Sequence, residues 1–195
     1  MLHELLRDEK LILASASPRR KEIFQMLGLN PLIIPADVHE PIDERPPRLI
    51  VQSHALHKAQ SISPHFDNNS IIVAADTLVY INKSTIGKPE SKDDAIKYLK
   101  MLSGKIHTVF TGVAILYKSH EVTDYEKSLV QFKSLSEQEI ASYIKTKEPF
   151  DKAGGYGIQG YGSQFIQSIK GCYFNVMGFP SHLFYQMLLK LISID

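Results

Sequence analysis

Short apolar runs alternate along this chain with segments that begin at a helix-capping residue. Residues 11–14 and 71–75 contain only Leu, Ile, Val and Ala, which is typical of buried strands. Ser17 followed by Pro18 is a typical helix start, and Gly28 is a typical helix end. This alternation favours an α/β fold in which helices connect the strands of a sheet.

The rest of the chain extends this pattern. We expect more strands at 31–35 and 79–81, and one short strand on each side of Lys170-Gly171. We also expect strands 106–117 and 122–133 to pair as a hairpin. We expect more helices after Pro47, from Ser91 to Gly104, at 136–145 and from Ser181. Five glycines between residues 154 and 162 predict a loop. A hairpin beside alternating units implies a mixed sheet, and no linker divides residues 1–195 into separate domains.

Composition narrows the class of function. Lys plus Arg number 22 and Asp plus Glu number 21, so the net charge is +1, which argues against general binding of duplex nucleic acid. The single cysteine, Cys172, excludes an intramolecular disulfide and is expected to be a small buried filler. No apolar run reaches the roughly 18 residues that a membrane span needs. Charged residues at 7–10 interrupt any signal peptide, so we expect a cytoplasmic protein without membrane contact.

The segment Ser15-Ala16-Ser17-Pro18-Arg19-Arg20 is a candidate anion site. A strand leads here through small residues into a helix N-terminus, where backbone N–H groups, two hydroxyls and two guanidinium groups can converge on a phosphate. The segment alone fits an ordinary capped surface helix equally well.

Asp76 directly follows a buried strand, which would place its carboxylate at the edge of the sheet, where α/β proteins hold ligands. It could bind Mg²⁺ or orient water, or it could cap a turn. Glu40 suits a hard cation, and Lys58 and Lys88 suit phosphates, although each alone is more commonly a solvated charge.

Two further patterns are weaker. His54 and His57 could meet on one helix face as a metal pair, but surface histidines are the favoured interpretation without a third ligand. Residues 155–160 match G-x-G-x-x-G, but no convincing helix and no acidic residue about 20 positions later follow, so a dinucleotide site is rejected.

Together these segments resemble the Maf family of nucleoside triphosphate pyrophosphatases. The resemblance is an ordered series that covers nearly the whole chain: SASPRR at 15–20, Glu40, Lys58-Ala59, Asp76-Thr77, GKP at 87–89, LSG at 102–104, TGV at 111–113, DKAGGYGIQG at 151–160 and NVMGFP at 175–180. It implies hydrolysis between the α and β phosphates, which yields a nucleoside monophosphate and pyrophosphate.

The resemblance also implies residue roles. Asp76 is the catalytic proton acceptor and, with Glu40, holds a divalent cation, Mg²⁺ or else Mn²⁺ or Co²⁺. The phosphates are bound by Ser15, Arg20, Lys58 and Lys88. Arg19, Thr77 and Gln159 stand at the positions that distinguish substrates, and they match the branch that acts on dTTP and UTP. His39 replaces an acidic residue that is common in the family, and it is either a spectator or a group that favours softer ions.

The implied fold is an elongated, curved mixed sheet flanked by helices, with a deep cleft between two lobes, similar to inosine triphosphate pyrophosphatases. The implied assembly is a homodimer. A pyrophosphatase for purine or modified nucleotides such as 7-methyl-GTP, and a nucleotide-sensing regulator of cell division or septum formation, stay open as alternatives.

Overall fold

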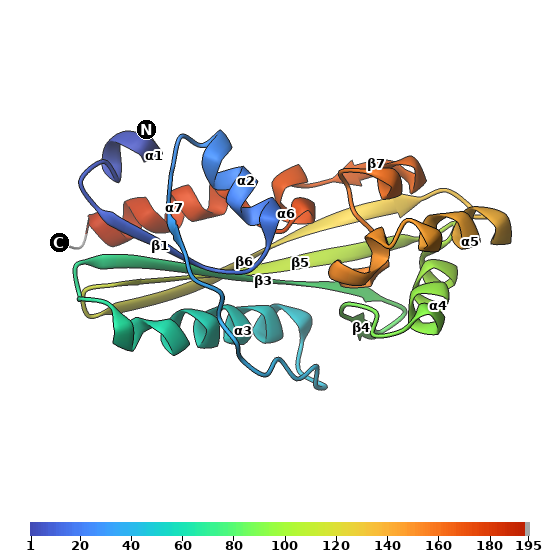
Figure 1. Cartoon of the computed structure of the whole chain (residues 1–195), viewed down its shortest axis with the longest axis horizontal. Helices are drawn as coiled ribbons and strands as arrows, with labels where there is room; N and C mark the ends of the chain where they lie inside the picture. The colour runs from blue at the N-terminus through green and yellow to red at the C-terminus, as the bar shows by residue number, and fades with distance from the viewer. Residues whose placement is uncertain (194–195) are drawn as a thin grey trace. The chain divides into compact units, whose positions relative to one another are not determined.

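A computed structural model describes residues 1–193, and the chain divides into two compact units (Figure 1). The first unit contains residues 1–76, 111–126 and the chain from Gly178 onwards; the second contains residues 77–110 and 127–177. Among the described residues, seven strands pair in the order β2-β1-β3-β5-β6-β7, with β4 added to β3. Strands β3 (Ser70–Ile81), β5 (Ile106–Tyr117) and β6 (His120–Phe132) each have residues in both units.

In the first unit, β1 (Lys10–Ala14) lies parallel to both β2 (Leu32–Ile33) and β3, with Ile12 opposite Ile72. Helix α3 (Pro47–Ile62) covers one face of this sheet, and α2 (Pro18–Met26) and α7 (Ser181–Ile192) cover the other (Figure 1). The unit also contains α1 (Leu2–Leu5) and the 3₁₀ turn η1 (Ser63–His65). The rings of Phe24, Phe179 and Phe184 pack together in its core.

In the second unit, β4 (Ser84–Ile86) and β7 (Ile166–Lys170) pair antiparallel with β3 and β6. Its helices are α4 (Lys92–Leu102), α5 (Glu137–Lys145) and α6 (Tyr173–Met177). Three 3₁₀ turns, η2 (Glu148–Asp151), η3 (Ala153–Gly155) and η4 (Tyr161–Phe165), lie before and at the two ends of the glycine-rich segment, whose middle, residues 156–160, is irregular. The core of this unit includes Leu99, Leu102, Val130, Phe132 and Ile140.

The predicted class, an α/β mixed sheet flanked by helices, is confirmed, as are most of the predicted elements. The starts of α4 and α5 are confirmed in detail, because Ser91 Oγ accepts from the backbone N–H of Asp94 and Ser136 Oγ from that of Glu139. Ser17 and Ser181 were expected to cap their helices, but neither α2 nor α7 has a side-chain cap bond.

Two predictions of secondary structure are wrong. Residues 173–177 form α6 instead of a strand, because buried Asn175 donates from Nδ2 to the carbonyl of Val109 at 3.1 Å and to Ser128 Oγ at 2.9 Å, which anchors a helical turn there. Cys172, just before this helix, is half-buried instead of fully buried. The strand expected at 71–75 also does not end before Asp76, since β3 is continuous from Ser70 to Ile81.

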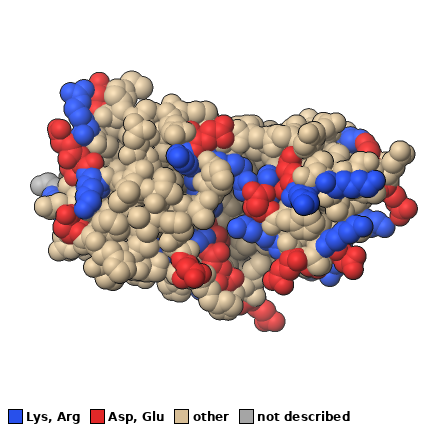
Figure 2. Space-filling view, in the orientation of Figure 1, with Lys and Arg blue, Asp and Glu red and all other residues tan. Residues whose placement is uncertain are grey.

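Charged side chains are interspersed by sign on the face drawn in Figure 2, in keeping with the net charge of +1. Within residues 1–193, no helix has the length and apolar character that crossing a membrane requires.

Candidate active site

Asp76 lies within β3, not at the end of a strand as the sequence predicted. The partner strand on one side changes here, because β1 pairs with β3 only as far as Ala74 and β4 pairs only from Val79. Pairing with β5 on the other side keeps β3 continuous. Side chains alternate between the faces of a strand, so Asp76 shares the face of Ile72 and Ala74, which packs against α3. The carboxylate is therefore buried against that helix.

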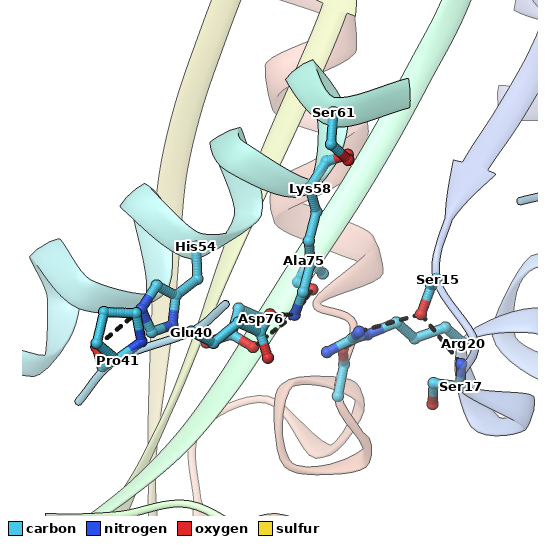
Figure 3. Close-up of polar contacts among 11 residues, drawn as sticks. Ser15, Ser17, Arg20, Glu40, Pro41, His54, Lys58, Ser61, Ala75 and Asp76 are labelled. Atoms are coloured by element: carbon cyan, nitrogen blue, oxygen red, sulfur yellow. Dashed lines mark hydrogen bonds and ion pairs between the residues drawn. The ribbon is translucent and has the colours of Figure 1, made fainter. Parts of the chain in front are cut away.

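Helix α3 supplies two partners for this carboxylate (Figure 3). Lys58 Nζ donates to Asp76 Oδ1 at 2.8 Å and also forms an ion pair with Glu40. One helical turn earlier, His54 Nδ1 lies 3.1 Å from Asp76 Oδ2. Residues four apart share a face of a helix, so both side chains meet the same carboxylate. Both of its oxygens are thereby held in fixed directions.

His54 corrects the expectation of a surface histidine, because only 2% of it is exposed. Its Nε2 lies 3.1 Å from the carbonyl oxygen of Pro41, which can only accept a hydrogen bond, so Nε2 donates. Nδ1 faces the carboxylate of Asp76 and donates as well. His54 thus joins β3 to the segment that carries Glu40. His57 is exposed as expected, and His39 is exposed too, so neither is the histidine of this site.

A close approach of backbones brings α3 to the sheet. A Cβ atom at Gly112 on β5 would lie 2.3 Å from the carbonyl oxygen of Val51 on α3. Only glycine leaves room for this contact. Ala55 and Ala59 of α3 are fully buried against the sheet, and their small side chains help to keep the helix close.

The interactions within the cluster favour the charged forms of Asp76 and His54. Burial alone would raise the pKa of Asp76, but the hydrogen bond from His54 and the charge of Lys58 hold it well below its usual range. Burial would lower the pKa of His54, yet the hydrogen bond to Asp76 and the nearby carboxylates raise it. The ionised carboxylate is thus held between two cationic donors.

The basic turn predicted at 15–20 forms beside this cluster (Figure 3). Buried Arg20 donates from Nη1 to Ser15 Oγ at 3.1 Å and from Nε to the carbonyl of Gly178 at 2.9 Å. The backbone N–H of Ser17 also donates to Ser15 Oγ, at 3.2 Å. Burial lowers the pKa of Arg20, opposed by the charges of Asp76 and Glu40, and the group keeps its charge.

The structure therefore brings together five residues that the sequence singled out: Ser15, Arg20, Glu40, Lys58 and Asp76. Arg19 is half-buried on α2. Three others belong to the second unit. Thr77 is half-buried in β3, Lys88 is exposed between β4 and α4, and Gln159 is half-buried between η3 and η4.

The residues present suit a divalent cation. Ligand atoms of Glu40, His54 and Asp76 all lie within 4.8 Å of one another, but both ring nitrogens of His54 donate hydrogen bonds here, so the carboxylates of Glu40 and Asp76 are the ligands that fit an ion. An octahedral ion with ligands at about 2.1 Å needs neighbouring ligands about 3 Å apart, so small side-chain rotations suffice. Two carboxylates are the hard donors that such an ion prefers. Lys58 contacts both of them, so its ammonium group would have to leave at least one when an ion binds.

Comparison with known proteins identifies the family of this chain. Residues 10–191 match the family model described as "Maf-like protein". The chain belongs to the Maf family. This Maf protein is 47% identical over 171 residues to a dTTP/UTP pyrophosphatase of Thermosipho africanus, an alignment that covers 88% of this chain and 87% of that protein. It is 43% identical to a dTTP/UTP pyrophosphatase of Caldicellulosiruptor saccharolyticus, over 94% and 95% of the two chains.

A third relative, a dTTP/UTP pyrophosphatase of Bacillus cereus, is 48% identical over 174 residues, which are 88% of this chain and 90% of that protein. Among solved structures, the Ham1 protein of Staphylococcus aureus is similar with a TM-score of 0.47 and 14% identity, over 80% of this chain and 79% of that one.

Proposed function

We propose that this Maf protein hydrolyses dTTP and UTP between the α and β phosphates and releases pyrophosphate. Family membership and the names of three relatives at 43–48% identity support the reaction and its substrates. The observation that carries the proposal is the buried carboxylate of Asp76, held between Lys58 and His54 beside Glu40 and Arg20. Buried charged groups with strongly shifted pKa values cluster at functional sites.

Binding of the triphosphate follows from charge. A nucleoside triphosphate carries about four negative charges, which cationic side chains and a metal ion must neutralise before the anhydride can be cleaved. Arg20, Lys58 and Lys88, with the hydroxyl of Ser15, are the groups that we assign to the phosphates. Arg20 is already fixed by two hydrogen bonds, so little side-chain entropy is lost when it meets a phosphate.

Glu40 and Asp76 would hold the divalent ion, with Mg²⁺ the first choice and Mn²⁺ or Co²⁺ as alternatives. When bound, the ion supplies charge neutralisation and orients the phosphates. Asp76 accepts a hydrogen bond from the attacking water and takes its proton. His54 holds the direction of the carboxylate through Oδ2, which orients Asp76 toward the water.

Selection of the base is assigned to Arg19, Thr77 and Gln159. The amide of Gln159 offers both a donor and an acceptor, which can match the edge of a pyrimidine. We also propose that residues 1–195 act as one catalytic domain, that the enzyme is a homodimer and that it works in the cytoplasm.

The test measures pyrophosphate release from dTTP, UTP, CTP, 7-methyl-GTP and ITP with Mg²⁺, Mn²⁺ and Co²⁺ in turn. We expect the highest kcat/KM for dTTP and UTP, and a loss of at least about 1,000-fold in Asp76→Asn with nucleotide binding retained. Asp67→Asn, which alters an exposed carboxylate in the turn before β3, is the control and should stay active. Preference for 7-methyl-GTP or ITP would refute the substrate assignment. Tight UTP binding without turnover would instead indicate a nucleotide sensor.

A further inference from the structure

The carboxylate of Glu148 organises the glycine-rich segment of the second unit. Its Oε1 accepts hydrogen bonds from the hydroxyl of Tyr143 at 2.9 Å and from the backbone N–H of Gly162 at 3.1 Å. Its Oε2 accepts from the backbone N–H of Tyr161 at 2.9 Å. The Tyr143 hydroxyl in turn accepts from the backbone N–H of Gly157 at 3.3 Å. We call residues 157–162 the arc. Glu148 therefore holds one end of the arc directly, at residues 161 and 162, and the other end, at Gly157, through the Tyr143 hydroxyl.

The arc is shaped to fit this carboxylate. Gly160 adopts φ = +94°, a conformation that favours glycine, and a Cβ atom there would lie 2.7 Å from Glu148 Oε2, so a side chain at this position would displace the carboxylate. The backbone of Glu148 is anchored as well, because Lys152 Nζ donates to its carbonyl oxygen at 3.0 Å. Burial raises the pKa of Tyr143 and the Glu148 carboxylate adds to this, so the hydroxyl stays protonated and donates.

A carboxylate is well matched to this task. Residues of a loop cannot pair their N–H groups in a helix or a strand ladder, and an ionised acceptor makes hydrogen bonds about twice as strong as a neutral one. The arc contains Gln159, which lies between the two anchored ends. The backbone position from which the Gln159 side chain extends therefore depends on Glu148.

We propose that Glu148 is a positioning residue for base selection, acting through Gln159. This rests on the proposed function, in which Gln159 reads the pyrimidine edge. Discrimination by hydrogen bonds requires donors and acceptors at fixed positions, since a mismatched polar group weakens binding by large factors. The Asp76 carboxylate is held by its own contacts to His54 and Lys58, so the phosphate chemistry does not depend on Glu148.

The experiment measures kcat and KM for UTP and CTP in wild type, Glu148→Gln, Gln159→Ala and the double variant. Glutamine preserves the size of Glu148 but replaces one acceptor oxygen with an NH₂ group, which cannot accept from a backbone N–H. Tyr143→Phe removes a single hydroxyl of the same network and serves if Glu148→Gln folds poorly. Glu137→Gln, at an exposed glutamate paired with Lys100, is the matched control. Thermal unfolding of every variant reports on folding.

We expect Glu148→Gln to raise KM for UTP about 10- to 30-fold and to leave kcat within about threefold, with a matching loss of UTP selectivity over CTP. Tyr143→Phe should shift KM in the same direction, and Glu137→Gln should match wild type. In the Gln159→Ala background, Glu148→Gln should add less than about twofold, because its effect passes through Gln159.

Multiplicative effects in the double variant, or equal loss of kcat for both nucleotides, would show that Glu148 only stabilises the fold and would overturn the proposal. Wild-type kinetics in Glu148→Gln would overturn it while leaving the proposed function standing. Wild type without activity on dTTP and UTP would refute the proposed function itself, and the role of Glu148 with it.

Discussion

Gly112→Ala tests whether the backbone contact between β5 and α3 sets the geometry around Asp76. The added Cβ would lie 2.3 Å from the carbonyl oxygen and 2.4 Å from the carbonyl carbon of Val51, whereas ordinary contacts begin at 3.4 Å. Both clashing atoms belong to helix backbone, so no side chain can rotate away. The helix must move by the difference, about 1 Å, because protein interiors leave no slack for such overlap.

This displacement predicts two separate effects. Overpacking lowers the free energy of unfolding by about 1 to 3 kcal/mol. The same 1 Å shift carries His54 and Lys58 away from Asp76, and hydrogen bonds now at 3.1 and 2.8 Å would lengthen beyond useful range. A misplacement of this size reduces kcat by about 100-fold. Urea unfolding measures the first effect, and pyrophosphate release from UTP measures the second.

Ala114→Gly is the matched control, because Ala114 lies two residues along the same strand and packs on the same face. It removes a methyl group instead of adding one, so it should lower the free energy of unfolding by about 1 kcal/mol without displacing α3. We expect its kcat to stay within about threefold of wild type. Equal loss of activity in both variants would mean that stability, and not helix position, controls turnover. A Gly112→Ala enzyme as active as wild type would refute the reasoning outright.

Three further predictions follow from other parts of the structure. His54→Ala should reduce kcat for UTP at least about 30-fold while His57→Ala, at an exposed position on the same helix, leaves it unchanged; equal losses in steady-state assays would contradict the assignment. Burial lowers the pKa of His107 to about 4. As the pH falls, the unfolded chain therefore takes up a proton at this histidine at a higher pH than the folded protein does, and the free energy of unfolding should fall by about 3 kcal/mol between pH 7 and pH 4. Urea unfolding of wild type and His107→Gln checks this, since the variant should lose that part of the slope. Phe24→Ala, within the cluster of three rings, should lower the free energy of unfolding by about 3 to 5 kcal/mol, and a loss below 1 kcal/mol in the same assay would show that the core collapses around the gap.

Local chemistry explains which elements could be predicted from the sequence. Ser91 and Ser136 are each followed three residues later by an acid, and both capping boxes form as the pattern predicts. These signals lie within one helical turn, so they need no knowledge of the rest of the fold. The glycine-rich segment was also predicted as irregular, but its organisation around Glu148 was not, because that carboxylate accepts from backbone N–H groups 13 and 14 positions away.

The location of Asp76 within a strand could not be predicted, because it depends on which strands pair with β3. A polar Asp-Thr pair after an apolar run is a typical strand end. In the structure one partner of β3 stops at Ala74 and the next begins at Val79, while β5 accompanies the strand on its other side. Only the order of strands in the sheet, a property of distant parts of the chain, decides that the strand continues.

The sequence does contain a pattern that indicates the burial of His54. It is the four-residue spacing of His54 and Lys58, and not the three-residue spacing of His54 and His57. Ala55 and Ala59 are four residues apart, and each directly follows His54 or Lys58. A helix that buries two alanines at this spacing brings its neighbouring positions close to the same sheet, and small residues there reduce the distance further. The pair of His54 with Lys58 at four residues therefore indicates a buried polar face, whereas the pair of His54 with His57 suggested a surface. The sequence could thus reveal that two cationic side chains point inward, but not that a single carboxylate would meet both. The meeting with one carboxylate depends on β3 packing against α3. Burying the charges of His54 and Lys58 would be unfavourable without a partner, and the Asp76 carboxylate on β3 provides that partner while its own direction is fixed by them.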